Sequence, residues 1–384
     1  MSEFDTLRSR TFSCPACGGR MVFSPEHQQL RCPYCGTLKP FQVLRETPYE
    51  YDIRFAPPAE DLAWGDTVRV ARCDGCGAEM VLTGETAAGA CPFCGAGTMR
   101  AAEAKAGIAP ELMVPFQLTQ DQAADVFHRW MRPRIFAPLS ARRPAAQGSI
   151  TGVYLPFWAY DDQATGEYLG QAGKYYTLKV PAAETGPDGG EPQEAREEQR
   201  THWKQVSGTV RSFFDDLMIP GSGRLPANLV SSVLPYQLSR RVRYAPEYIA
   251  GFPTEKPTVD VQGGWEQARQ QVDPRLAELA RRDILSSADE AKVTSVMTTH
   301  ESVRYKLVLL PMYLCAFRYR KKTYHVLVNG QNGRIGGRVP VSLLRAAVAA
   351  LAGLAALAGL GWLFMHNGGQ YLFYDSGRML HALL

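Results

Sequence analysis

The chain has 384 residues, of which 45% are apolar and 21% charged, and its net charge is +4. This composition is ordinary for a folded globular protein and excludes a chain that is disordered throughout. So small a net charge does not mark the whole protein as nucleic-acid binding, and any basic surface has to be argued locally. The first ten residues lack the apolar segment of a secretory signal, so we expect the cysteines to face a reducing cytosol.

Eight of the nine cysteines form four C-x-x-C pairs. The first two pairs are Cys14, Cys17, Cys32 and Cys35, and the other two are Cys73, Cys76, Cys91 and Cys94. In a reducing compartment, such pairs favour metal binding over disulfides. Zinc prefers four ligands at tetrahedral corners, and a glycine after each pair permits the tight turn that presents two thiolates to one ion. We therefore predict zinc ribbons at residues 11–45 and 68–100, each holding one zinc ion.

The two ribbons are related as a tandem repeat, because a shift of 59 residues carries Cys14 onto Cys73 and every other ribbon cysteine onto its counterpart. Rubredoxin-like iron and a redox-active dithiol are the alternatives to zinc. A catalytic zinc would keep an open position and usually includes histidine or carboxylate. His27 lies in the first loop, but Thr86 stands at the equivalent place in the second, so we expect a surface histidine.

Residues 46–67 contain a proline pair and alternating charges and are predicted to form a linker. Residues 108–340 are predicted to form a β-rich α+β domain in the cytosol. Within it, Thr119 is placed to cap an amphipathic helix that ends near Trp130. The aromatic-rich run from Ser149 to Tyr160 predicts a strand.

The second half of this domain contains an insertion, a helix and a hairpin. Residues 181–200 are rich in Glu, Gly and Pro and are predicted to be a mobile insertion. Trp265–Ile284 has helical spacing, which we expect Pro274 to interrupt. Val303–Tyr319 and Thr323–Val328 predict a hairpin.

The tip of this hairpin carries the basic cluster Arg320-Lys321-Lys322. We expect the cluster to be a solvated tip, with contacts to the phosphates of nucleic acid or lipid as the alternative. The turn that follows contains two Asn-Gly pairs, Asn329-Gly330 and Asn332-Gly333, which both suit positive φ. The turn leads into a short strand at Arg334-Ile335.

No catalytic motif is recognisable. The acidic pairs Asp161-Asp162 and Asp215-Asp216 adjoin predicted strand ends, so we expect solvated turn residues. His202, His300 and His325 are isolated in the sequence, and Cys315 lies in an apolar strand, where a buried inert thiol is expected. We therefore predict that the protein is not an enzyme.

Residues 343–366 are predicted to form a transmembrane helix, because no charged residue occurs from Ala346 to Met365. Twenty helical residues span about 30 Å, the thickness of a bilayer's hydrocarbon core. The alternative is a buried helix of a soluble domain. Small residues spaced four apart in this segment, such as Ala349 and Gly353, suggest self-association, so a homo-oligomer is a further hypothesis.

The orientation of this helix follows from the charges around it. Basic residues crowd its N-terminal side, whereas only Arg378 lies beyond it. The positive-inside rule then places the large N-terminal part in the cytosol and leaves residues 367–384 as a short outer tail. We predict a single-pass protein of the cytoplasmic membrane.

Several segments together point to a family. The ribbons read CPACGGRMVF…CPYCG and CDGCGAEMVL…CPFCG, and the domain contains ITGVYLPFWAYD and LLPMYLCAFRYRKKTYHVLVNGQNGRIGG. These segments resemble the bacterial tandem zinc-ribbon membrane proteins labelled TFIIB-type zinc-ribbon or "primosomal protein N′-like", over most of residues 11–340. The resemblance implies a membrane adaptor whose partners are phage-shock-protein A homologues or SPFH proteins.

Two features set limits to this resemblance. Asp74-Gly75 replaces the usual Pro-x of the third cysteine turn, which should alter the turn but not the ligation. The ATP-binding loop G-x-x-x-x-G-K-[ST] is absent from the sequence, so the helicase-like label does not carry a helicase function with it.

The sequence thus predicts a β-rich α+β protein with two small zinc ribbons, a cytosolic domain and one C-terminal transmembrane helix. The expected function is a membrane-anchored, zinc-binding adaptor or scaffold that recruits protein partners to the cytoplasmic membrane, with envelope stress as the setting that the resemblance implies. The alternative is a membrane-tethered zinc-ribbon protein that binds nucleic acid.

Overall fold

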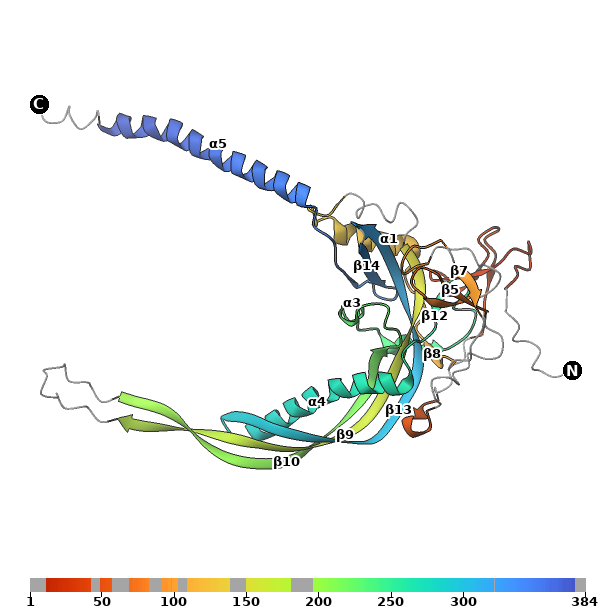
Figure 1. Cartoon of the computed structure of the whole chain (residues 1–384), viewed down its shortest axis with the longest axis horizontal. Helices are drawn as coiled ribbons and strands as arrows, with labels where there is room; N and C mark the ends of the chain where they lie inside the picture. Colours follow the sequence, from red (N-terminus) through yellow and green to blue (C-terminus); the bar gives the residue numbers. More distant parts are fainter. Residues whose placement is uncertain are drawn as a thin grey trace, which may run out of the picture.

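A computed structural model describes residues 12–42, 49–56, 69–82, 91–97, 99–102, 109–138, 150–180, 196–320 and 322–376. Over these ranges the protein is α+β and rich in strands (Figure 1). Two clusters of four cysteines lie near the N-terminus, and one apolar helix lies near the C-terminus. The expected fold class is confirmed at this level.

The two cysteine units form small sheets. The first unit is a separate three-stranded sheet of β1 (Val22–Ser24), β2 (Gln29–Arg31) and β3 (Leu38–Lys39). The second unit contributes β5 (Arg69–Cys73), β6 (Glu79–Leu82) and β7 (Met99–Ala102) to the large sheet. It joins that sheet because β6 pairs with β12 (Thr254–Glu255), a strand of the central domain. The second unit is therefore continuous with the domain through backbone hydrogen bonds.

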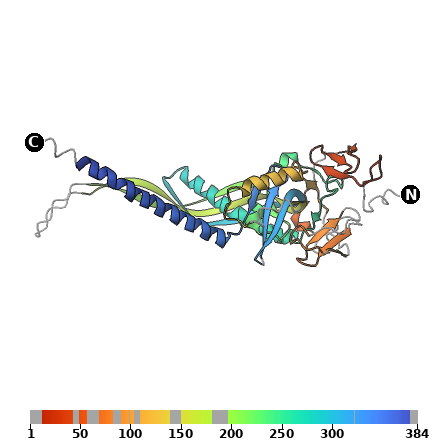
Figure 2. The ribbon, with the colours of Figure 1, turned by 90° about the horizontal axis from the view of Figure 1, so that it is seen from above.

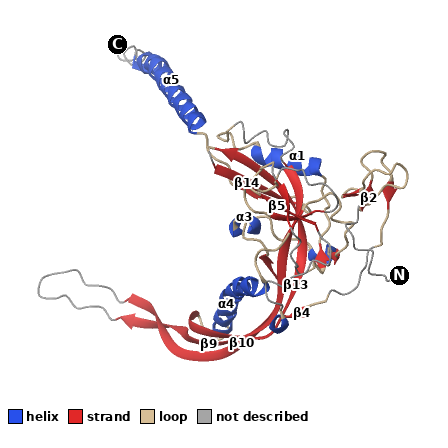
Figure 3. Ribbon diagram, turned by 45° about the vertical axis from the view of Figure 1, so that its right-hand side comes forward, coloured by secondary structure: helices blue, strands red, loops and turns tan. Residues whose placement is uncertain are grey.

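Three very long antiparallel strands dominate the domain. β9 (Ile150–Val180) lies between β10 (Arg196–Pro220) and β13 (Glu290–Tyr319), and together they form a curved arm that projects from the body (Figure 3). The strand expected to end at Tyr160 thus continues to Val180. The sequence pattern does not predict this continuation, because its residues are mostly polar or small and show no alternation of apolar and polar side chains.

Shorter strands complete the sheet. They are β4 (Tyr51–Asp52), β8 (Leu112–Met113), β11 (Val242–Arg243), β14 (Lys322–Asn329) and β15 (Ile335–Gly337). The hairpin expected around residue 320 is confirmed, because β13 pairs antiparallel with β14 and Arg320 at its tip has φ +46°. Of the two Asn-Gly pairs expected at positive φ, Asn332-Gly333 is confirmed, with φ +74° at the glycine. Gly330 does not adopt positive φ, contrary to expectation, because its N–H donates a 2.9 Å hydrogen bond to the carbonyl of Pro311 and so continues the pairing with β13.

Two longer helices pack against this sheet. α1 (Gln120–Met131) begins at Thr119 with a reciprocal capping box to Gln122, which confirms the expected cap. α4 (Val261–Leu285) runs along the arm (Figure 1). Pro274 does not interrupt α4, contrary to expectation, since it lies on the exposed side of the helix. Shorter helical turns are η2 (Ile53–Phe55), α3 (Ala227–Ser231) and η5 (Leu238–Arg240).

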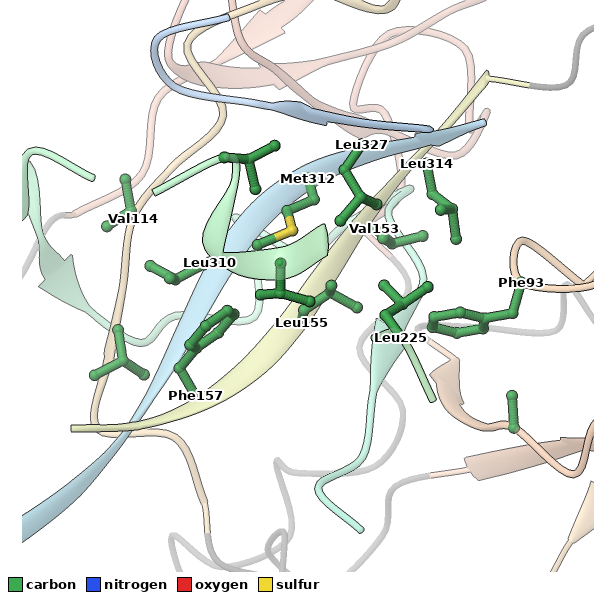
Figure 4. Close-up of a cluster of buried hydrophobic side chains, with 14 of the residues drawn as sticks. Phe93, Val114, Val153, Leu155, Phe157, Leu225, Leu310, Met312, Leu314 and Leu327 are labelled. Carbon is green, nitrogen blue, oxygen red and sulfur yellow. The ribbon is translucent and has the colours of Figure 1, made fainter. Parts of the chain in front are cut away.

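The core lies on both faces of β9 and β13, because successive strand side chains point to opposite faces. On one face, Val153, Leu155 and Phe157 pack with Leu310 and with Phe93 of the second cysteine unit (Figure 4). On the other face a second cluster packs against α4; its strand members include Trp158, Tyr160 and Leu307. The second cysteine unit therefore shares its core with the domain.

α5 (Leu343–Ser376) extends from the body as a long isolated helix (Figures 1 and 2). Its segment Leu343–His366 has a mean hydropathy of 2.0 and is 0% buried, so it is long and apolar enough to cross a membrane. Such exposure argues against the buried helix of a soluble domain. The helix continues to Ser376, beyond the predicted span, and residues 377–384 of the predicted tail lie outside the described part.

The predicted insertion at residues 181–200 divides into two parts. Residues 181–195 lie outside the described part of the chain. Residues 196–200 form the beginning of β10, which pairs with β9 from Arg196 onward. This end of the predicted insertion is therefore regular strand rather than loop, because backbone pairing along the arm overrides the local polar composition.

Candidate metal centres

The first cluster unites the four cysteines predicted to bind one zinc ion. The Sγ atoms of Cys14 and Cys35 lie 3.5 Å apart, and those of Cys17 and Cys32 are also 3.5 Å apart. Cys14 and Cys32 are buried, whereas Cys17 and Cys35 are exposed. One edge of the cluster thus faces the body and the other faces solvent.

The second cluster repeats this arrangement. Its Sγ atoms are separated by 3.5 Å between Cys73 and Cys94 and by 3.6 Å between Cys76 and Cys91. In each cluster all four sulfur atoms lie within 4.8 Å of one another. The two sets of four ligands therefore assemble as the repeat predicts.

A glycine shapes the turn at each of the four cysteine pairs. Gly18 has φ +73° and donates a 2.9 Å hydrogen bond to the carbonyl of Cys14. Gly77 has φ +71° and donates a 2.8 Å bond to the carbonyl of Cys73. Residues with a Cβ rarely adopt this conformation, so the glycine after each pair is a structural requirement.

The donor set fits a metal ion of tetrahedral preference. A zinc ion with Zn–S bonds of about 2.3 Å separates its sulfur ligands by about 3.8 Å, close to the spacing of both clusters. A disulfide requires about 2.05 Å, and all of these cysteines are free. Each cluster could therefore hold one metal ion, and four thiolates are the ligands that structural zinc prefers.

The cysteine pKa values are shifted in both directions: those of Cys14, Cys35 and Cys73 are lowered, whereas those of Cys17, Cys76 and Cys91 are raised. The hydroxyl and backbone N–H of Thr37 lower the pKa of Cys35 to about 6. Burial raises the pKa of Cys73, but backbone N–H groups of Cys76 and Gly75 outweigh it and bring the pKa to about 7. Since metals bind thiolates, Cys35 and Cys73 are prepared for ligation near neutral pH.

Hydrogen bonds from an arginine of the domain hold the second cluster in place. Arg224 donates hydrogen bonds of 2.7 Å and 2.6 Å to the carbonyls of Cys76 and Gly77. Its Nε lies 3.2 Å from a carboxylate oxygen of Glu255, a side chain that is only 1% exposed. Burial raises the pKa of Glu255 to about 7, against the opposing effects of Ser222 and Arg224. No local pattern signals this contact, since Arg224 lies 147 residues from Gly77.

The first cluster's ribbon reaches the domain through a close backbone approach. The N–H of Phe23 donates a 2.9 Å hydrogen bond to the carbonyl of Ala250, and its ring lies 5.1 Å from that of Tyr248. Gly251 follows with φ +86°, and a Cβ there would come within 2.8 Å of Val22. A glycine at residue 251 thus allows the ribbon to seat on the domain.

Of the acidic pairs expected to be solvated turn residues, Asp161-Asp162 is buried instead, whereas Asp215 is exposed as expected and Asp216 is partly buried. Asp161 is 4% exposed and Asp162 is fully buried, because β9 runs through them rather than ending there. The Nζ of Lys306 lies 3.0 Å from Asp161, 2.9 Å from Asp216 and 3.0 Å from Glu50. A bulge of β10 between Phe214 and Leu217 brings Asp216 to this position.

Lys306 is the cation of this group. Asp161, Asp215 and Asp216 are close enough together to hold a metal ion, but the ammonium group already lies among their carboxylates. Burial lowers the pKa of Lys306, but bonds to Asp216 and Asp161 outweigh it and raise the pKa overall. The pKa of Asp161 is lowered: burial opposes this, while the N–H of Asp216 and Lys306 favour it. The network is therefore a buried ion cluster.

Three histidines each contact a neighbouring group of the protein, and Cys315 is buried. Nδ1 of His300, which looked isolated in sequence, lies 2.8 Å from a carboxylate oxygen of Asp162. Nε2 of His325 lies 2.6 Å from the carbonyl of Phe93, which ties the hairpin to the second cysteine unit. His27 contacts Ser24 within its own ribbon turn, and Cys315 is buried as expected. None of these residues joins either cysteine cluster.

Comparison with other proteins gives a distant likeness over most of the chain. A similar protein is the uncharacterized protein YdjG of Bacillus subtilis (strain 168), which is 23% identical over 345 residues. The match covers 88% of this chain and 92% of that protein, so it extends well beyond the cysteine units. The chain matches no protein-family model and no solved structure.

Proposed function

We propose that this protein is a membrane-anchored, zinc-binding scaffold that recruits a protein partner to the cytoplasmic membrane. The apolar helix α5 supports the anchor, and the two thiolate clusters support structural zinc. Four cysteines complete a tetrahedral shell and leave no open position for water or substrate, so we propose a non-catalytic role for both metals.

The observation that carries the proposal is a set of three exposed apolar side chains on one face of the arm. α4 covers one face of the arm, where Tyr168 and Val296 lie beneath it. Leu169, Phe213 and Met297 are 59%, 64% and 71% exposed, and they come from β9, β10 and β13 respectively. Leu169 and Met297 are neighbours on β9 and β13, and Phe213 lies farther along the arm beside Gln163. We propose that these exposed apolar side chains mark an interaction surface.

Strand register places these three side chains on the face opposite α4. Met297 is paired with Glu167, and Phe213 is paired with Gln163. Paired residues share a face, and Gln163, Glu167 and Leu169 alternate with the residues that contact α4. Leu169 and Met297 also line a pocket of about 370 Å³.

The occupant that we propose for this face is an amphipathic helix of a partner protein. α4 shows how a helix covers the arm, since an apolar stripe along it packs on the sheet; the stripe includes Ala268, Val272, Leu276 and Ala280. A partner helix could complete the opposite layer in the same way. The resemblance described above suggests phage-shock-protein A homologues as the partners, with SPFH proteins as the other group.

This proposal is tested by binding of a purified phage-shock-protein A homologue to the full chain in detergent. The substitutions Phe213→Glu and Met297→Glu, made together, should weaken binding about tenfold or more, because they place charges in a desolvated contact. Phe55→Glu is the matched control, since Phe55 is 81% exposed but lies outside the arm. Equal binding by all variants would contradict the arm as the recruiting surface.

The proposal also constrains how the protein sits at a membrane. α5 and the arm leave the body toward the same side (Figures 1 and 2). The outer part of the arm carries exposed charges such as Lys174 and Lys204, which the hydrocarbon core would reject. We propose that α5 tilts in the bilayer so that the arm stays in the cytosol; single spans tilt by about 0–40°.

Nucleic-acid binding is the second candidate, and the basic hairpin tip favours it. Arg320 and Lys322 are exposed there, and the sequence contains no carboxylate from Ser302 to Tyr374. This candidate predicts that log K falls by about 0.9 per neutralised phosphate on duplex DNA as log salt rises. Fluorescence anisotropy of the full chain with DNA and RNA over a salt series tests it. Submicromolar binding at physiological salt would favour this candidate over the scaffold.

A further inference from the structure

A turn far from the span in sequence lies beside its first residues. The chain leaves α1 at Met131 and turns through residues 133–138. The N–H of Ser342 donates a 2.8 Å hydrogen bond to the carbonyl of Phe136. Arg345, in the first turn of α5, donates bonds of 3.2 Å and 2.9 Å to the carbonyls of Ile135 and Ala137.

Two side chains of this turn are apolar and exposed, beside Arg134, whose guanidinium lies over the Trp130 ring. Ile135 is 60% exposed and Phe136 is 39% exposed. The beginning of the span beside them is also apolar, since Val341, Leu343 and Leu344 are 58%, 65% and 74% exposed. Single exposed apolar residues are common on protein surfaces, but a group that continues directly into a transmembrane candidate is not.

The charge around this group is positive. No carboxylate occurs between Arg129 and Arg143, or from Ser302 to Tyr374. Arg129, Arg132 and Arg338 are exposed in these two segments. Apolar side chains rimmed by arginine match the boundary between acyl chains and anionic headgroups, where the cations meet phosphate and the apolar groups enter the acyl layer.

We propose that the turn at residues 133–138 is a second membrane contact, which seats Ile135 and Phe136 in the cytoplasmic leaflet beside the span. The inference rests on the proposed membrane anchor. In this proposal the body contacts the membrane at a second place besides α5. The hydrogen bonds of Ser342 and Arg345 to the turn hold it next to the residue at which α5 enters the bilayer. The occupant of this surface is an anionic lipid leaflet.

The contact would also limit how the scaffold is oriented. A body attached by one helix alone can rotate about the helix axis. A second contact beside the entry point removes this freedom and holds the arm in one direction relative to the membrane. The exposed face of the arm would then be presented to cytosolic partners in a constant way.

Site-specific photocrosslinking in the full chain tests this proposal. The chain is reconstituted into vesicles of phosphatidylethanolamine and phosphatidylglycerol with Phe136→p-benzoyl-phenylalanine, or with Ile135→p-benzoyl-phenylalanine as a second variant. Phe55→p-benzoyl-phenylalanine is the matched control, because Phe55 is exposed next to β4, which pairs with β13 at Tyr305 rather than near α5. Lipid adducts are measured by mass spectrometry, and a carbonate wash of the same vesicles reports on the anchor.

Lipid adducts at positions 135 and 136, several-fold above those at position 55, are the expected result. Adducts to a second protein chain, or lipid adducts no more frequent than at position 55, overturn the membrane contact. If the chain resists the carbonate wash in that case, the anchor stands and only the second contact fails. If the wash removes the chain, the anchor fails as well, so the two failures are distinguishable.

Discussion

The guanidinium group of Arg224 lies 3.2 Å from the carboxylate of Glu255 while it donates two hydrogen bonds to the second cysteine cluster. Glu255 stands in β12, whose backbone pairs with β6 of the same cysteine unit. The metal turn and the sheet are thus joined both by a strand pair and by a buried charge. Stability of the second cluster should therefore depend on the domain.

Replacing this arginine should weaken metal retention at one cluster only. Arg224→Met removes the donors to Cys76 and Gly77 and leaves Glu255 buried without its cation, a costly change. We expect zinc to leave the second cluster faster and the first cluster at an unchanged rate. Release into a chromogenic chelator measures both phases. Arg54→Met, at an exposed ion pair, is the control; equal acceleration of both phases would refute the coupling.

Each cluster should bind one zinc ion independently, because each set of four cysteines is complete within its repeat. The double substitution Cys32→Ser and Cys35→Ser should remove one equivalent and leave the second. Structural zinc contributes on the order of 10 kcal/mol to the folding of small sites, so the altered ribbon should also become protease-sensitive. Elemental analysis and limited proteolysis check this. Loss of both ions, or iron instead of zinc, would contradict it.

Lys306→Met should destabilise the domain strongly. The substitution leaves the buried carboxylate of Asp161 without its cation, whereas Asp216 keeps Arg241 at 2.6 Å. Removing one partner of a buried pair costs about 3–5 kcal/mol. Thermal unfolding of the full chain in detergent should show a lower midpoint. Arg282→Met, which breaks an exposed helix pair, should change the midpoint little.

The effect of Lys306→Met should depend on pH in one direction. Because the folded-state pKa of Asp161 is lowered, its contribution is present above the ordinary value of 3.8 and is lost as the pH falls through the folded-state pKa. The midpoint difference between the two proteins should therefore be large at pH 7 and smaller near pH 3. Any loss of zinc in acid affects both proteins and does not change this comparison. A difference that grows in acid would disprove the assignment.

The chain should behave as an integral membrane protein with its N-terminal part in the cytosol. Carbonate washing should leave it in the membrane pellet, and deletion of residues 346–365 should release it, because that segment supplies the apolar length of the span. An alkaline phosphatase fused to the C-terminus should be active, since the tail is expected outside. An inactive fusion in a membrane-bound chain would reverse the orientation.

The span should also contribute to self-association if its small residues form a contact face. Apart from the backbone of α5 itself and the adjoining residues, no atom lies within 4 Å of a Cβ built at Gly353 or Gly359, so both sites are open in the single chain. Gly353→Ile and Gly359→Ile should preserve insertion while reducing association in a bacterial two-hybrid transmembrane assay. Leu354→Ile is a control that keeps the small residues. Unchanged association in the double variant would exclude this face.

The sequence alone determined the features that depend on local pattern. The spacing of the cysteine pairs and their glycines predicted both clusters, because a tight turn fixes where two thiolates point. The same holds for the cap at Thr119 and for the apolar run that forms α5, which need only a few neighbouring residues. These elements lie where the pattern predicted them.

The tertiary structure alone decided the features that join distant residues. The acidic pair at residues 161 and 162 looks like a turn in sequence, but β9 continues past it. Burial is tolerated because β13 supplies Lys306 as the partner of Asp161 and His300 as the partner of Asp162. Pairing with β10 and β13 likewise keeps the polar part of β9 in strand conformation. The tertiary fold also places Arg224 next to the second cysteine unit. Such contacts depend on strand register and on charges far apart in the chain. A pattern among neighbouring residues predicts neither of them.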